Sequence, residues 1–312
     1  MTISAISSDR PLRIGTRRSP LALAQAEMAA DAIRRTNSLV QGAVILVPML
    51  ASGDKIQDRP LAEIGGKALW TKELERALID DVIDIAVHSM KDVETVRPDL
   101  FTIAAMLPRA DVRDRLIGAA SIDALRQGAR IGTSSPRRTA QMLRLRPDLQ
   151  IVPLRGNVAT RLARIQTGEA DATLLAAAGL DRLGMSEIGS AIETGEILPA
   201  ASQGAVGIDR LSSRDDLAVL LESVNHTATF AAVMAERAFL EALGGSCHSP
   251  VAAFAEVLGD MISLRAQIFN ADGSHMQAGH VHYAAADLAA PARLAADILA
   301  SAHPSISALF NP

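Results

Sequence analysis

Short apolar segments alternate with longer amphipathic ones along the first two thirds of this 312-residue chain. A short apolar run is typical of a buried strand, and a longer amphipathic run is typical of a helix. Helices that alternate with strands connect parallel neighbours of one sheet and cover its faces. The pattern therefore predicts α/β domains, and the chain length predicts more than one domain.

Two sets of such segments follow one another. In each set one helix begins with a serine N-cap followed by proline, Ser19-Pro20 in the first and Ser135-Pro136 in the second. The first set is expected to comprise strands Leu12–Gly15, Val44–Leu50 and Ile83–Val87 and helices Ser19–Arg35 and Thr71–Ile79. The second is expected to comprise strands Arg130–Gly132, Ile151–Leu154, Ala172–Ala176 and Ala205–Asp209 and helices Ser135–Arg146 and Asn157–Gln166.

The last third has a different pattern. A long helix is expected over Ala228–Leu243, and a second helix over Ala285–Ala300. Between them, Val251–Val257 and Met261–Phe269 alternate apolar and polar residues, as antiparallel strands joined by a short turn do. This region therefore predicts a smaller α+β domain.

Composition and termini limit the function classes. The formal net charge of −4 argues against a general nucleic-acid binder. Cys247 is the only cysteine, so no disulfide can form within the chain, and a cytoplasmic location is expected. The polar segment Met1–Pro11 lacks the apolar core of an export signal, and no membrane segment is expected.

Common catalytic motifs are absent from the sequence. It contains no G-x-G-x-x-G dinucleotide fingerprint, no G-x-x-x-x-G-K-[ST] phosphate loop and no G-x-S-x-G nucleophile elbow. The seven histidines have no cysteine or acidic partner at ligand spacing, so no metal site is expected.

Polar clusters follow several expected strands, where open α/β sheets bind their ligands. Arg17 precedes a helix whose first backbone N–H groups favour an anion. After the strand ending at Val87, the residues Ser89, Lys91 and Asp92 crowd together with His88. A carboxylate beside Lys91 could stay ionised and stabilise a cation. Ordinary capping and solvation would explain each cluster taken alone.

Between Arg126 and Arg164 the chain carries nine arginines and one acidic residue, Asp148. A guanidinium suits carboxylates and phosphates. Arg137 and Arg138 fall in the first turn of an expected helix, where the helix dipole favours acids, so an anionic ligand is indicated. On charge alone, solvated helix faces remain the simpler explanation.

Cys247 follows Gly244-Gly245-Ser246 in an expected loop. A lone cysteine is more often a small buried hydrophobe than a reactive group. Its glycine, serine and proline neighbours favour exposure, as for a nucleophile or a point of covalent attachment.

Taken together, these segments resemble the porphobilinogen deaminase family, also called hydroxymethylbilane synthase. The matching motifs, in chain order from Arg13, are R-I-G-T-R-x-S-P-L-A-L-x-Q, G-G-K-A-L-W-T-K-E-L, D-I-A-V-H-S-M-K-D, G-T-S-S-x-R-R, L-R-G-N-V-x-T-R, A-A-A-G-L-D-R-L-G and S-Q-G-A-V-G-I. Ala235-Glu-Arg-Ala238 stands before the cysteine loop, as in the family, and the resemblance weakens after Pro250.

The resemblance implies an α/β fold class with two periplasmic-binding-protein-like α/β domains and a smaller C-terminal α+β domain. Domain 1 would span residues 1–108 and 202–223, domain 2 residues 109–201, and domain 3 residues 224–312. In the family the active cleft lies between the first two domains. Domain 3 would carry Cys247 on a loop facing that cleft.

The family joins four molecules of porphobilinogen head to tail and releases ammonia at each step. The product is a linear hydroxymethyl tetrapyrrole, the precursor of haem and related pigments. The resemblance implies a dipyrromethane cofactor, built from substrate and held by a thioether to Cys247. It also implies a cytoplasmic monomer with no nucleic-acid or membrane partner.

The resemblance also implies roles for individual residues, with Asp92 as the catalytic aspartate. The implied cofactor contacts are Ser89, Lys91, Thr133, Ser134, Ser135, Arg137 and Arg138. The implied substrate contacts are Arg17, Gln25, Arg155, Asn157, Arg161 and Arg182. Gly66, Lys67 and Trp70 fall in a segment that resembles the family's mobile loop.

Four positions depart from the family pattern. Ser246 separates the glycine pair from the cysteine, Glu63 stands in place of lysine, and Trp70 in place of phenylalanine. Pro136 replaces an aliphatic residue at a helix start, which tolerates proline. None of these departures removes a group that the chemistry needs.

Two other classes of protein compete with this interpretation. A non-enzymatic, two-lobed anion-binding protein would explain the arginines but would need neither Asp92 nor Cys247. An RNA-binding protein would use the arginine-rich stretch, but aromatic residues for base stacking make up only 3% of the chain. A covalent adduct on Cys247 would distinguish the enzyme from both binders.

Overall fold

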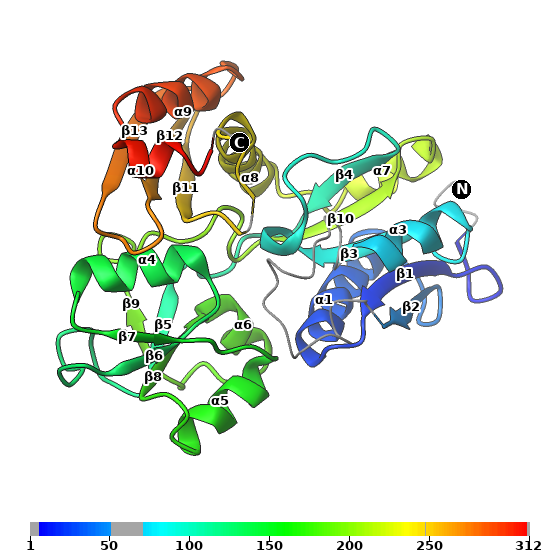
Figure 1. The fold of residues 1–312 in the computed structure, drawn as a ribbon. Helices are drawn as coiled ribbons and strands as arrows, with labels where there is room; N and C mark the ends of the chain where they lie inside the picture. Colours follow the sequence, from blue (N-terminus) through cyan, green and yellow to red (C-terminus); the bar gives the residue numbers. More distant parts are fainter. Residues whose placement is uncertain (1–5, 51–70, 247, 311–312) are drawn as a thin grey trace. The chain divides into compact units, whose positions relative to one another are not determined.

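The structure, a computed structural model, describes residues 6–50, 71–246 and 248–310 (Figure 1). The chain forms two compact units. Unit 1 comprises Met1–Ala110 and Ala205–Phe230, and unit 2 comprises Asp111–Gly204 and Ala231–Pro312. The chain therefore leaves unit 1, forms the whole α/β sheet of unit 2, and returns at Ala205 to complete the sheet of unit 1.

Unit 1 contains a five-stranded sheet with the order β2-β1-β3-β10-β4. Strand β1 (Leu12–Arg17) is parallel to β2 (Val44–Met49) and to β3 (Ile85–Ser89). The returning strand β10 (Val206–Leu211) is antiparallel to both β3 and β4 (Phe101–Met106). The carboxyl ends of β1 and β3 consequently meet at one edge of the sheet.

Helices cover this sheet because their apolar faces need partners. Helix α1 (Pro20–Thr36) begins where the Ser19 side chain accepts a hydrogen bond from the Ala22 N–H. Its buried face packs with β1, β3 and helix α7 (Ala218–Glu222) in one apolar core, as Figure 1 shows for α1. Helix α3 (Lys72–Ile79) packs through Leu74 and Leu78 in a second cluster. A short 3₁₀ helix, η2 (Met90–Asp92), continues from β3.

Unit 2 contains a second five-stranded sheet, with the order β7-β6-β8-β5-β9. Strand β6 (Arg130–Gly132) is parallel to β7 (Gln150–Val152) and β8 (Ala172–Ala176). Strand β5 (Asp114–Ile117) is antiparallel to β8 and to β9 (Ser190–Ile192). Three helices connect these strands: α4 (Pro136–Leu145), α5 (Val158–Gln166) and α6 (Ala177–Arg182).

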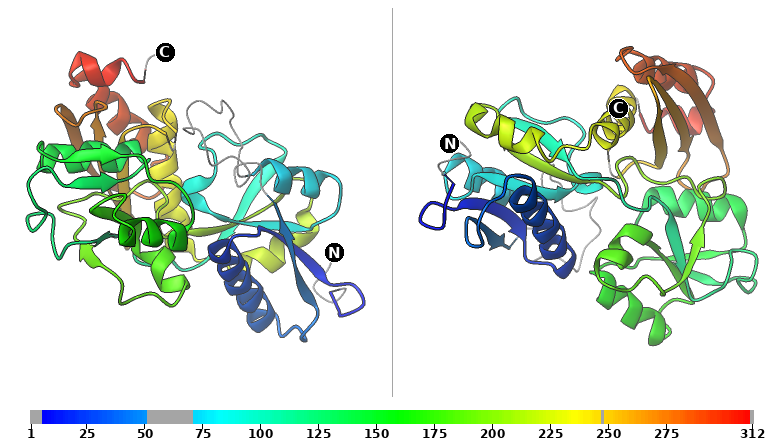
Figure 2. Two further views of the ribbon diagram at one scale, coloured as in Figure 1. Left: turned by 60° about the horizontal axis from the view of Figure 1, so that its bottom comes forward. Right: turned by 180° about the vertical axis from the view of Figure 1, so that it is seen from behind.

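A three-stranded antiparallel sheet completes unit 2. Its strands are β11 (Val251–Leu258), β12 (Met261–Phe269) and β13 (Met276–Ala284). The helices around it are α8 (Thr227–Ala242), α9 (Ala290–Ala300) and α10 (Pro304–Ser307). Residues of α8, α9 and α10 share one apolar core with the sheet, and Figure 2 shows α9 lying along these strands.

The same small sheet also packs against the α/β part of unit 2. Ala252 and Phe254 alternate with the residues that face the helices, and they join Ala140 of α4 and Leu198 in a separate apolar cluster. Both faces of β11 are therefore covered, which explains why its first five residues are all buried. This contact holds the two parts in one compact unit.

The predicted α/β fold class is confirmed: two five-stranded sheets with connecting helices accompany a smaller three-stranded antiparallel sheet with helices of its own. The sequence did not predict β4, β5, β9 or β13. Strand β13 is an edge strand with mostly half-buried or exposed residues, so it lacks an apolar pattern. The last predicted helix was too long, because residues 285–289 form a turn and α9 begins next to Pro291.

Within the described ranges, no single helix is long and apolar enough to cross a membrane, and α8 meets the criteria only together with the short helical segment before it.

The turn between β12 and β13 yields a stability prediction. A Cβ on Gly273 would lie 2.0 Å from the backbone oxygen of Ala140, and Gly273 has φ +72°. Gly168 has φ +75° but open space around it. We expect Gly168→Ala to cost about 1–2 kcal/mol from backbone strain alone. Gly273→Ala should cost about 1–3 kcal/mol more, because the contact with α4 must move. Urea unfolding monitored by circular dichroism would measure both, and equal losses would contradict the close contact.

Candidate active site

A pocket in unit 1 lies where β1 and β3 end. Its lining includes Arg17 from the end of β1, Gln25 from α1, and His88, Ser89 and Asp92 from β3 and η2. These side chains meet because β1 and β3 are parallel neighbours, with Ile14 opposite Ile85. The structure thus brings together four of the residues predicted from the sequence, Arg17, Gln25, Ser89 and Asp92. We call this the unit-1 pocket.

Buried donors face this pocket. Gln25 is only 3% exposed, and its Nε2 forms no hydrogen bond with any residue that the structure describes. Leaving a buried amide donor unpaired costs free energy, so a polar ligand is the natural partner. Arg17 and Asp92 are half-buried, which lets a ligand reach their charges. Lys91 is half-buried in η2, between Met90 and Asp92.

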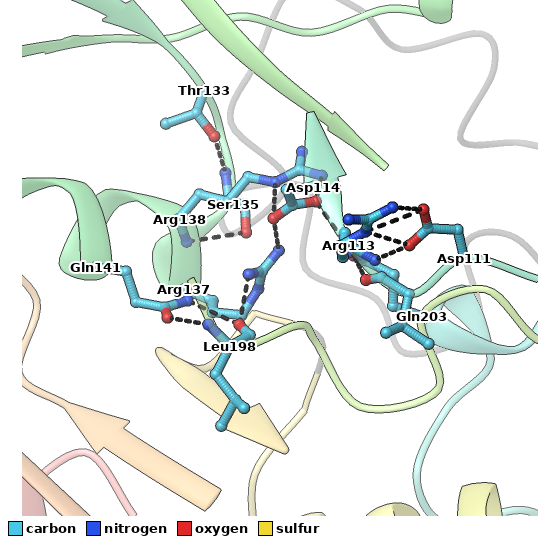
Figure 3. A network of polar contacts seen from close by, with 11 residues as sticks. Asp111, Arg113, Asp114, Thr133, Ser135, Arg137, Arg138, Gln141, Leu198 and Gln203 are labelled. Atoms are coloured by element: carbon cyan, nitrogen blue, oxygen red, sulfur yellow. Dashed lines mark hydrogen bonds and ion pairs between the residues drawn. The ribbon is translucent and has the colours of Figure 1, made fainter. Parts of the chain in front are cut away.

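In unit 2, two of the predicted arginines meet a buried carboxylate (Figure 3). Asp114 Oδ1 accepts from Arg138 Nη2 at 2.7 Å, and Asp114 Oδ2 accepts from Arg137 Nη2 at 2.7 Å. Gln203 Nε2 donates to Asp114 Oδ1 at 3.0 Å. All four side chains are nearly inaccessible to solvent, with Arg137 3% and Arg138 6% exposed. We call these four residues the Asp114 cluster.

Charge explains why this cluster is stable. Burial alone raises the pKa of Asp114, but the two guanidinium groups outweigh it and hold the pKa well below its ordinary value. Burial lowers the pKa of Arg137, and Asp114 opposes that shift. Two guanidinium charges against one carboxylate leave the cluster with one positive charge. Each guanidinium carries five N–H donors, so donors remain for a further anion.

Hydrogen bonds also fix the helix that carries these arginines. Arg137 Nη1 donates to the backbone oxygen of Leu198 at 2.8 Å, and Gln141 donates to the same oxygen at 3.0 Å (Figure 3). Gln141 Oε1 accepts from the Leu198 N–H at 2.8 Å. Three hydrogen bonds therefore hold the loop at Leu198 against α4.

The predicted hydroxyl ligands after β6 have structural partners. Thr133 Oγ1 accepts from the Ser135 N–H at 3.1 Å, and Ser135 Oγ accepts from the Arg138 N–H at 3.4 Å as the N-cap of α4 (Figure 3). Ser134, which is exposed, donates to the backbone oxygen of Leu154 at 3.3 Å. These contacts build the turn, while the Thr133 and Ser135 hydroxyl protons can still be donated.

The remaining predicted substrate residues of unit 2 lie near the start of α5 and the end of α6. Asn157 is the N-cap of α5, where its Oδ1 accepts from the Thr160 N–H at 2.9 Å. Arg155 and Arg161 are half-buried, and Arg161 Nε donates to the Gly156 oxygen at 2.9 Å. Arg182 Nη2 donates to the Gly204 oxygen at 2.7 Å.

Arg182 resembles Gln25 in having an unsatisfied buried donor. Its Nε is buried and forms no hydrogen bond in the part of the chain that the structure describes. Burial lowers the pKa of Arg182, and Asp181 acts in the opposite direction. An anionic ligand would satisfy both the donor and the charge.

Several predicted residues lie outside the described residues. These are the predicted attachment point, Cys247, and the three residues of the predicted mobile loop, Gly66, Lys67 and Trp70. Among the described residues, no group of three or more histidine, cysteine, aspartate or glutamate side chains is arranged to hold a metal ion.

Sequence reasoning missed the acids that organise both sites. Asp114 opens a short strand, and nothing in the sequence pairs it with arginines more than twenty positions away. In unit 1, Asp209 lies 2.6 Å from Arg97 and is fully buried. An arginine follows each aspartate directly in its strand, so neither acid stands out in the sequence as a lone charge among apolar residues.

Fold and site together define a class: an α/β protein whose unit 2 carries buried arginines suited to an anion and whose unit-1 pocket carries a half-buried carboxylate. Comparison with known proteins specifies the class further. Residues 12–219 match the family model "Porphobilinogen deaminase, dipyromethane cofactor binding domain", and residues 230–300 match "Porphobilinogen deaminase, C-terminal domain". The chain belongs to the porphobilinogen deaminase family.

Individual relatives agree with the family match. The chain is 57% identical over 308 residues to the porphobilinogen deaminase of Sphingopyxis alaskensis, and the match covers 97% of each chain. It is 48% identical over 283 residues to that of Paracoccus denitrificans, covering 90% of each chain. It is 46% identical over 290 residues to that of Nitrobacter winogradskyi, covering 92% of each chain. The family predicted from sequence motifs is therefore confirmed.

The Asp114 cluster yields a second stability prediction. Asp114→Asn removes the only carboxylate that the cluster provides for two buried guanidinium groups, and should cost about 3–5 kcal/mol at pH 7. Because folding lowers the pKa of Asp114, its stabilisation is fully present above its ordinary pKa of 3.8 and is lost progressively as the pH falls from that value toward the lower pKa of the folded state. The difference between variant and parent should therefore shrink in acid.

Asp148→Asn is the matched control, because Asp148 pairs with Arg146 at the protein surface. It should cost much less stability than Asp114→Asn at pH 7. Urea unfolding at pH 7 and pH 3 would measure both variants. A pH-independent loss in Asp114→Asn would show that the carboxylate charge is not what stabilises the cluster.

Proposed function

We propose that this chain, a transferase of the porphobilinogen deaminase family, condenses four porphobilinogen molecules head to tail and releases one ammonia at each step. The product would be the linear tetrapyrrole hydroxymethylbilane. The observation that carries the proposal is that Asp92 and Arg17 both line the unit-1 pocket. One side chain suits a cation, and the other suits a carboxylate.

Asp92 is the proposed catalytic residue. Loss of ammonia from the aminomethyl group of porphobilinogen leaves positive charge on the pyrrole ring. A carboxylate beside the pyrrole N–H would stabilise that charge and could assist proton transfer. The half-buried position of Asp92 at the end of η2 supports this role, because water is partly excluded while a ligand can still approach.

The arginines are the proposed partners of the substrate's acetate and propionate groups. Each ring adds two carboxylates, so the negative charge grows with the chain. The proposed substrate contacts are Arg17, Gln25, Arg155, Asn157, Arg161 and Arg182. Unsatisfied donors on Gln25 and Arg182 support the assignment, since both have buried N–H groups without partners among the described residues. In Asn157, the amide nitrogen is not used by the helix cap.

The residues present fit a dipyrromethane cofactor, because its carboxylates match the residual positive charge of the Asp114 cluster and the orphaned Nε of Arg137. When bound, this group supplies the pyrrole carbon to which the first substrate is joined. We propose Cys247 as its thioether anchor. The proposed contacts that hold and orient it are Ser89, Lys91, Thr133, Ser134, Ser135, Arg137 and Arg138.

The proposal also covers cellular location, oligomeric state and a mobile loop. A thioether anchor needs a reduced Cys247 thiol, which fits a cytoplasmic location. We propose a monomer without nucleic-acid or membrane partners, and Gly66, Lys67 and Trp70 as part of a mobile loop. Light scattering coupled to size exclusion would test the monomer directly.

The direct test of the function is turnover of porphobilinogen. The purified protein should release one ammonia for each porphobilinogen consumed and form one tetrapyrrole from four substrates. Saturable binding of porphobilinogen without ammonia release would contradict the enzyme and favour an anion-binding protein.

The role of Asp92 leads to a prediction for a nearly isosteric variant. Asp92→Asn should lower kcat by at least about 10³-fold, since the amide cannot stabilise the developing cation. Asp99→Asn, an exposed acid of the same unit outside the pocket, should keep parental kcat. Steady-state ammonia release would measure both. Near-parental turnover in Asp92→Asn would refute the assigned role.

The role of Cys247 leads to a prediction for covalent loading. Cys247→Ser replaces the only thiol of the chain, so no stable thioether can form and the variant should keep its apo mass after incubation with porphobilinogen. Ser246→Ala is the control, and it should load normally because the thiol remains. If Cys247→Ser gained the same covalently bound mass as the parent protein, the anchor would lie on another residue.

A further inference from the structure

His88 is a buried histidine at the end of β3 that the proposed chemistry has not used. It is 7% exposed and lines the unit-1 pocket together with Asp92, Arg17 and Gln25. Its Nε2 is buried and makes no hydrogen bond to any described residue, and Asp209 Oδ2 lies 3.6 Å away. One edge of the imidazole thus lies beside a carboxylate, while the residue itself borders the pocket.

Asp209 is held in place opposite His88 by the sheet and by a second charged pair. Strand β10 runs antiparallel to β3 with Gly207 opposite His88, so Asp209 lies on the same face one diagonal position away. Arg97 Nη2 donates to Asp209 Oδ2 at 2.6 Å. Arg97 also pairs with Glu75 and lies over the Phe101 ring, 5.1 Å from its centroid. The Asp209 carboxylate therefore has little freedom to move.

This arrangement selects one form of the imidazole. Burial lowers the pKa of His88, opposed by Asp209 and Glu75 and supported by Arg97 and Arg17, so the ring is neutral near pH 7. A neutral imidazole has one N–H and one acceptor nitrogen. The neighbouring Asp209 carboxylate favours the proton on Nε2, as carboxylates do in many histidine sites. Nδ1 is then the acceptor.

We propose that His88 is a further substrate-contacting residue, whose Nδ1 accepts a hydrogen bond from a nitrogen donor of porphobilinogen beside Asp92. Asp209 is its positioning residue. The donor is the pyrrole N–H or the aminomethyl ammonium, the two nitrogen donors that this substrate offers. The inference rests on the proposed function, and it adds a neutral acceptor to the charged groups of the pocket.

Two substitutions of His88 distinguish its nitrogens. The amide of asparagine reaches about as far as Nδ1, and that of glutamine about as far as Nε2. We expect His88→Asn to keep kcat within about tenfold of the parent, and His88→Gln to lose about 100-fold. Asp209→Asn should lower kcat about 10–100-fold. The asparagine amide can donate to Nε2 of His88, which favours the tautomer with its proton on Nδ1.

The control is His226→Asn. His226 lies in unit 1 outside the pocket, and its Nδ1 bonds with the hydroxyl of Thr229. Asparagine suits this helix-start position, so kcat should not change. Thermal midpoint and intact mass of each protein are measured beside kcat and KM. The His88 variants should load the cofactor and unfold within a few degrees of the parent.

The outcomes separate this inference from the function on which it rests. A higher kcat in His88→Asn than in His88→Gln, with matched thermal midpoints of unfolding, would support the inference. Equal losses in the two variants, or kcat within twofold of the parent in both His88→Gln and Asp209→Asn, would overturn it. A parent protein that loads no cofactor and releases no ammonia would instead contradict the proposed function.

Discussion

The buried carboxylate of Asp114 makes the contacts on which the arginine-rich interior of unit 2 depends. It lets two arginines lie inside unit 2, where an unpaired guanidinium would be very costly. It also leaves one positive charge uncompensated, and that charge is available to a carboxylate ligand. The same side chains bind the Leu198 loop and Gln203, which precedes the return of the chain to unit 1. The arginines that we propose as ligand contacts therefore also fix the course of the chain through unit 2.

In unit 1 the buried acid has one arginine partner instead of two. Here the buried acid, Asp209, is paired with Arg97, and its neighbour in the direction of the pocket is a neutral histidine. The pocket itself carries Arg17 and Asp92, one charge of each sign. Such a site can hold a carboxylate of a substrate while stabilising positive charge elsewhere on the same molecule. A substrate with carboxylates and a departing ammonia has both requirements.

The sequence predicted those parts of the structure that depend on local chemistry. Ser19 and Ser135 cap helices as predicted, because a serine before a helix start can accept a hydrogen bond from a free backbone N–H. The parallel strands were found because short apolar segments alternate with amphipathic helices along the chain. Strand β13 was missed because an edge strand carries little apolar signal, and Asp114 was missed because its partners are distant in sequence. The motifs identified the family, yet they did not show that Thr133 also builds the turn that presents the arginines.

The central claim is that this chain carries a covalent primer built from its own substrate, and the intact mass of the purified protein tests it most directly. The account predicts an added mass equal to two linked porphobilinogen units, located by peptide mapping on the peptide that contains Cys247. A protein isolated without the group should gain it on incubation with porphobilinogen. An unmodified Cys247 after that incubation would contradict the account.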